Sequence, residues 1–150
     1  MSLNPFDLHY TLLAKHAQHV VLIHFPIALL ITGAAFDFLG QWTKRRALVE
    51  AAYFNILAAA ISTVPTLATG FVAWRFALDG QKMKGLLLEH VILACTSSLL
   101  IWVIWYAHFH ARTKSLPPPN FRLWIELAAV AVIALTGHLG GFLSGVNGPG

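Results

Sequence analysis

The stretch HAQHVVLIHFPIALL, residues 16–30, combines three histidines, a Phe25-Pro26 step and the beginning of an apolar run that continues to Trp42. About 20 apolar residues are enough to cross a bilayer core of about 30 Å, so this stretch opens a candidate membrane helix. Histidine is costly in hydrocarbon and is the commonest metal ligand among side chains. The histidines therefore indicate a ligand site near the mouth of the helix or contact with the membrane interface.

The composition excludes an ordinary water-soluble domain. The 150 residues are 57% hydrophobic and 11% charged, whereas soluble domains carry about 25% charged residues. A single cysteine, Cys95, excludes a disulfide framework and a cysteine-based metal site. The basic residues are scattered at the ends of the apolar segments, which suits lipid headgroups better than nucleic acid.

The hydropathy pattern predicts four membrane helices, at about residues 18–42, 47–76, 85–110 and 121–146. None shows the alternation of a β-barrel strand. The short connections predict antiparallel neighbours, and hence an all-α, up-down four-helix bundle forming a single membrane domain over residues 1–150. A short amphipathic segment at residues 1–17 is expected to precede it along the membrane interface. No internal repeat is evident.

Basic residues at the helix ends predict the orientation. The first and third connections carry six of them and the opposite side carries four. Because cytoplasmic loops are enriched in lysine and arginine, we expect the first and third connections in the cytoplasm and both termini outside.

Three histidines on different helices are expected at a similar depth. His24 lies near the start of the first helix, and His90 lies near the start of the third on the same side. His138 lies 17 residues after Phe121, which at 1.5 Å per residue is roughly 26 Å from the cytoplasmic side. His19 lies just above them. Such convergence favours a shared ligand over independent interfacial histidines.

Haem b is the first candidate for that ligand, because four-helix bundles build cofactor sites from side chains on facing helices. In an up-down bundle the first and third helices are diagonal, so His24 and His90 are the expected axial ligands to iron. His138 and His19 are the next candidates. A bare zinc or copper ion held by these imidazoles is the alternative ligand.

Other polar residues have plainer expected roles. His108 and His110 are expected at the cytoplasmic interface. Asp37 and Glu50 are expected to pair with the cations of the first connection, which are Lys44, Arg45 and Arg46.

Several motifs resemble a known family. They are His19-x-x-x-x-His24-Phe-Pro-Ile-Ala-Leu, the early His90, Thr136-Gly-His-Leu-Gly-Gly141 and Gly145-Val-Asn-Gly148. Together, over residues 16–148, they look like family 2231 of the domains of unknown function, which are small bacterial four-helix membrane proteins. Many members carry proline directly after the first histidine, where this chain has Val20. The architecture is also similar to that of the membrane cytochrome b superfamily.

The sequence thus predicts a membrane-bound haem b electron-transfer protein of the bacterial inner membrane, acting near the outer, periplasmic face. It is expected to be a subunit of a larger respiratory or other electron-transfer complex, with a quinol or a cytochrome as partner, rather than a catalyst on its own. The alternatives are a cofactor-free structural or assembly subunit and a protein with a histidine metal-ion site.

Overall fold

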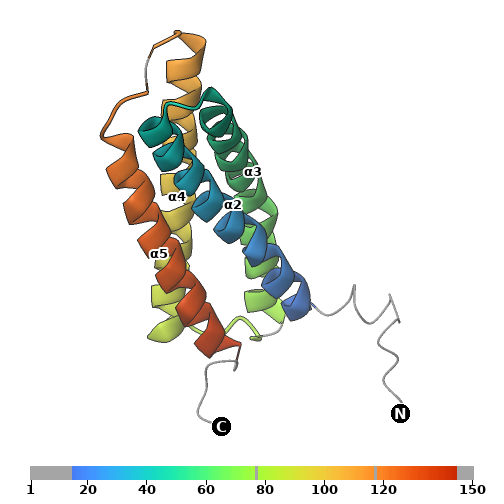
Figure 1. The fold of residues 1–150 in the computed structure, drawn as a ribbon. Coiled ribbons are helices and arrows are strands. Elements are labelled where there is room, and N and C mark those ends of the chain that lie inside the picture. The colour runs from blue at the N-terminus through green and yellow to red at the C-terminus, as the bar shows by residue number, and fades with distance from the viewer. Residues whose placement is uncertain (1–14, 77, 117, 145–150) are drawn as a thin grey trace.

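The computed structural model describes residues 15–76, 78–116 and 118–144, and it contains four long helices (Figure 1). They are α2 (Lys15–Thr43), α3 (Arg46–Phe76), α4 (Leu86–Thr113) and α5 (Arg122–Leu143). All four are long and apolar enough to cross a membrane, and the described residues form no strand. The all-α, four-helix prediction is confirmed, with boundaries within three residues of those expected. The amphipathic segment expected at residues 1–17 lies almost entirely outside the described residues.

The bundle is built from two helical hairpins. α2 packs extensively along α3, and α4 packs along α5, while the contacts of α3 with α4 and of α2 with α5 are sparser. The first hairpin is close because two glycines of α2 face α3. A Cβ added to Gly33 would lie 2.8 Å from Cγ1 of Ile56, and one added to Gly40 would lie 2.9 Å from Cγ2 of Val49. Small residues at such positions let membrane helices approach closely.

The hydrophobic core lies where the two hairpins meet. It consists of buried residues from every helix, namely Leu30, Ile56, Ala59, Ala60, Ile101, Ile104, Ala129 and Ile133. Large apolar side chains also cover the outside of the bundle, including Phe38, Phe54, Ile92 and Leu127. An exterior of this kind is suited to lipid.

Pro26 lies inside α2, where its missing N–H leaves the carbonyl of Leu22 without its usual helical donor. The hydroxyl of Thr66 on α3 lies 3.3 Å from that carbonyl oxygen. Neighbouring helices commonly satisfy backbone groups that proline frees in a membrane helix. That hydroxyl has a closer acceptor, the carbonyl oxygen of Ser62 at 2.8 Å, so the freed carbonyl of Leu22 receives it as a second, longer contact.

The two hairpins repeat one pattern of burial. Adding 71 to each buried position of α2 (26, 30, 33, 37 and 40) gives a buried position of α4 (97, 101, 104, 108 and 111). Adding 70 to positions 52, 56, 59 and 63 of α3 gives the buried positions 122, 126, 129 and 133 of α5, whereas the buried Ala60, Ala73 and Thr136 have no buried counterpart at this offset. The hairpins therefore share much of one burial pattern, which we call the repeat, and in it α2 corresponds to α4 and α3 to α5.

The repeat also leaves a trace in the sequence. Residues 19–23 read HVVLI and residues 90–94 read HVILA, while Thr66-x-x-x-Gly70 corresponds to Thr136-x-x-x-Gly140. This trace was not expected from the sequence, because the matches are few and the offset differs between the two helix pairs. We call the end of the bundle with these motifs the His19–His90 end, and the opposite end the Asp37–His108 end.

Candidate functional site

His19 of α2 is fixed against α3 at the His19–His90 end. Its Nδ1 lies 3.2 Å from the carbonyl oxygen of Thr66 and 3.4 Å from Oγ1 of Thr69. The ring rests on Gly70, where an added Cβ would lie 3.0 Å from the imidazole Cε1. The glycine thus provides the space in which the imidazole lies against the helix.

His90 of α4 makes the corresponding contacts with α5. Its Nδ1 lies 3.0 Å from the carbonyl oxygen of Thr136. A Cβ on Gly140 would lie 3.2 Å from the imidazole Cε1. The second hairpin therefore repeats the histidine, the threonine carbonyl and the glycine of the first.

These contacts determine the tautomer of both rings. A carbonyl oxygen can only accept, so Nδ1 must carry the proton in His19 and in His90. In the neutral Nδ1–H tautomer the lone pair is on Nε2, the form in which imidazole binds a metal. Metal-bound histidines typically donate their other ring N–H to a carbonyl or a carboxylate. Both rings thus donate to a backbone carbonyl in the way that metal-bound histidines do.

The other two predicted ligands are placed differently. His24 is exposed, and its Nδ1 donates to the carbonyl oxygen of Val20 in its own helix, at 2.7 Å. His138 is exposed on α5, with its ring centroid 5.0 Å from that of Phe142. By the repeat, the position equivalent to His90 is His19, whereas the position equivalent to His24 is Cys95. The axial pairing of His24 with His90 stays a prediction.

A second polar cluster lies at the Asp37–His108 end, and sequence reasoning missed it. It comprises four buried ionisable residues from three helices, namely Asp37 of α2, His108 of α4, and Arg122 and Glu126 of α5. Nε and Nη2 of Arg122 each donate to one oxygen of Asp37 at 2.8 Å. Nε2 of His108 lies 2.9 Å from Oε1 of Glu126 and 3.9 Å from Oδ2 of Asp37. We call these residues the buried quartet.

The buried quartet corrects two expectations. His108 is not at the interface but is 4% exposed. Asp37 pairs with Arg122 rather than with the first connection. Two charges spaced four apart in apolar α5, and a histidine 18 residues after His90, were the signals that could have located the cluster.

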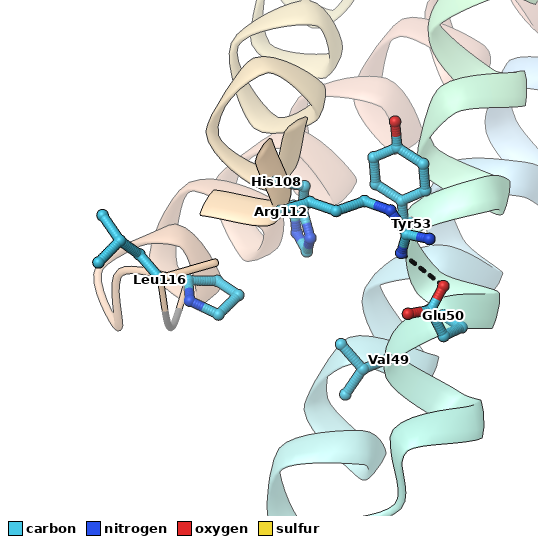
Figure 2. A pocket seen from close by; sticks show the side chains of 7 residues that line it. Val49, Glu50, Tyr53, His108, Arg112 and Leu116 are labelled. Carbon is cyan, nitrogen blue, oxygen red and sulfur yellow. Dashed lines mark hydrogen bonds and ion pairs between the residues drawn. The ribbon is translucent and has the colours of Figure 1, made fainter. Parts of the chain in front are cut away.

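Glu50 corrects the remaining pairing. It pairs with Arg112 across α3 and α4, not with the cations of the first connection (Figure 2). The guanidinium of Arg112 also lies 4.9 Å from the ring centroid of Tyr53. His110, in contrast, is exposed.

A pocket of about 160 Å³ adjoins the buried quartet. It is lined by Val49, Glu50, Tyr53, His108, Arg112, Leu116 and Pro118. Figure 2 shows Arg112 extending from α4 to Glu50 on α3, with His108 one turn earlier on the same helix. His108 thus belongs both to the buried quartet and to the wall of a polar pocket.

The two ends differ in chemistry. The His19–His90 end offers two imidazoles, each oriented by a backbone carbonyl, and two imidazoles are the donor set that bis-histidine haem requires. The buried quartet offers two carboxylates, one imidazole and a guanidinium. The guanidinium already engages both oxygens of Asp37, which makes that carboxylate a poor ligand for a further cation.

Comparison with known proteins gives one match. A family model described as "Predicted membrane protein (DUF2231)" matches residues 15–148. No curated protein and no solved structure matches the chain. The family resemblance expected from the motifs is confirmed, and the cytochrome b-like architecture has no support from the comparisons.

Proposed function

We propose that this chain, which belongs to the DUF2231 family of predicted membrane proteins, binds haem b at the His19–His90 end. The proposed axial ligands are His19 and His90, and the proposed role is single-electron transfer within a larger membrane complex. The carrying observation is the repeated arrangement in which each Nδ1–H donates to a threonine carbonyl beside a glycine.

The family match establishes a membrane protein, and the proposal goes further in three respects. It assigns the chain to the bacterial inner membrane, with the His19–His90 end at the periplasmic face. It names a quinol or a cytochrome as the redox partner. It also gives His24 and His138 the role of outward-facing side chains near the site, in place of iron ligands.

The chain's own residues would hold and orient the cofactor. The carbonyls of Thr66 and Thr136 fix the two rings, because rotation of either imidazole would break its hydrogen bond. Donation to a carbonyl also raises the basicity of the ligating nitrogen. Bound haem would supply one-electron redox chemistry.

An absorbance spectrum of the purified protein in detergent tests the proposal. We expect a Soret band that shifts on reduction and an α band that appears in the reduced state. His19→Ala and His90→Ala should each abolish the bis-histidine spectrum, because each removes one iron ligand. His24→Ala and His138→Ala are the matched controls at the same end and should retain it.

The outcomes separate the alternatives. Loss of the spectrum in His24→Ala but not in His19→Ala would return the ligand role to His24. Folded protein without haem absorbance, purified from haem-replete cells, would contradict the haem proposal. Elemental analysis of that sample would then distinguish a zinc or copper protein from a cofactor-free structural subunit.

A further inference from the structure

We propose that the buried quartet is a proton-binding site: it holds one proton that makes His108 an imidazolium paired with Glu126, and it exchanges that proton with water through the adjoining pocket. The site lies at the end of the bundle opposite the proposed haem site. It does not depend on haem being bound.

The charges around His108 and Glu126 leave one carboxylate without a cation. The charged and titratable groups facing them are Asp37 on α2, Glu50 and Tyr53 on α3, Arg112 on α4, and Arg122 on α5. Two ion pairs account for four of these. Arg122 neutralises Asp37, and Arg112 neutralises Glu50. Tyr53 is uncharged at neutral pH. Among these facing groups, no cation outside an ion pair is therefore left to neutralise Glu126.

The Glu126 carboxylate is buried with one of its oxygens unpartnered among the described residues. The residue is 1% exposed, and Oε2 has no hydrogen-bond partner among the described residues. An ionised carboxylate in the interior of a membrane protein is costly unless it is paired. Its one contact, at 2.9 Å, is with Nε2 of His108. One proton brings the formal charge of the four residues to zero, and on His108 it also turns this contact into an ion pair, whereas on Glu126 it would leave a neutral hydrogen bond.

The repeat supports the same pairing. Asp37 and His108 occupy equivalent positions of α2 and α4, and the second hairpin carries Arg122 and Glu126 where the first carries Ala52 and Ile56. The cation Arg122 and the anion Glu126 thus lie one turn apart on α5. Arg122 pairs with Asp37, and Glu126 contacts His108. With His108 protonated, both cross-helix pairs join opposite charges.

The pocket provides the route for exchange. His108 lines it together with Glu50, Tyr53 and Arg112, and the Glu50–Arg112 pair at its wall is about half exposed. The hollow between α2 and α5 is instead lined mainly by apolar side chains, Phe38, Trp42 and Leu123. The pocket therefore gives water a route to His108 beside charged side chains, whereas Asp37 and Glu126 are not among its lining residues.

Nitrogen NMR of the full-length protein, with the side chains of histidine labelled, tests the protonation state directly. The His108 signal is assigned by its loss in His108→Gln. We expect both ring nitrogens of His108 to give imidazolium signals at neutral pH and to convert to a neutral tautomer as the pH rises. A neutral His108 ring from about pH 5 to about pH 9 would overturn the proposal. One tightly bound metal ion per chain that is lost in Glu126→Gln would overturn it too.

Glu126→Gln tests the coupling to stability. If the folded state binds one more proton than the unfolded state, the unfolding equilibrium constant rises by up to tenfold per pH unit as the pH increases. Glu126→Gln removes the negative charge, so the imidazolium is no longer needed and this pH dependence should disappear. Glu50→Gln is the matched control, because the same change at the pocket wall should leave the dependence intact. Equal pH dependence in wild type and Glu126→Gln would contradict the proposal. If Glu126→Gln does not fold, the NMR result on the wild type decides.

Discussion

Arg122→Met is expected to reduce the free energy of unfolding by about 3–5 kcal/mol, the cost typical of removing one partner from a buried ion pair. The variant leaves Asp37 fully buried and charged, with the amide of Gln41 as a donor at 3.2 Å and Nε2 of His108 3.9 Å away, but without the two donors of the guanidinium. It also removes the Arg122 donors to the carbonyls of Pro118 and Pro119 in the α4–α5 connection. Reversible unfolding in detergent measures the loss.

Arg112→Met is the matched control for this prediction. Arg112, like Arg122, pairs with a carboxylate on another helix. Its side chain, however, is 47% exposed, and that of its partner Glu50 is 52% exposed. An exposed pair of this kind is worth about 0.2–1 kcal/mol. The double variant Asp37→Asn/Arg122→Met removes both buried charges and should recover part of the loss. If Arg122→Met costs no more than Arg112→Met, the buried pair does not stabilise the bundle.

Gly40→Ala is expected to destabilise the protein by about 1–3 kcal/mol, the usual cost of overpacking. Helix propensity alone predicts the opposite sign, because alanine is favoured over glycine by about 1 kcal/mol. The added Cβ would, however, lie 2.9 Å from Cγ2 and 3.0 Å from the backbone nitrogen of Val49. A backbone atom cannot move aside as a flexible side chain can, so α2 and α3 must separate.

Gly137→Ala on α5 is the control for that substitution. Its Cβ would meet only Cδ1 of Ile27, at the ordinary contact distance of 3.7 Å. We expect this variant to be neutral or more stable than the wild type by up to about 1 kcal/mol. Parallel unfolding curves of the two variants give the comparison. An equal gain in stability from both would mean that the close approach of α2 and α3 is not limiting.

The helices were predictable because each is a long apolar segment bounded by charged or helix-breaking residues. Their extents follow from local sequence, and the structure differs from the prediction by at most three residues. The direction in which a polar side chain points was harder to predict. Depth along a helix placed His19, His24 and His90 near one another, but depth does not say which of them faces another helix.

The contacts within the buried quartet were not predicted from the sequence, and the reason is different. Asp37 was expected to pair with cations close to it in sequence, whereas its partner, Arg122, is 85 residues away. In a membrane interior the cost of an unpaired charge makes each such residue a constraint on the whole bundle. His108 and Asp37 were given unrelated roles in the prediction. The repeat relation between positions 37 and 108 would have linked them.

The repeat also means that the order of the hairpins along the chain is not dictated by their packing. The connection at residues 78–85 lies at the same end of the bundle as the start of α2 and the finish of α5 (Figure 1). A circular permutant that begins in this connection and joins the former ends by a flexible linker would place α4–α5 first. Each helix would still run in its present direction, and every interhelical contact described above could form unchanged. The two hairpins could therefore be encoded in either order and would form the same bundle.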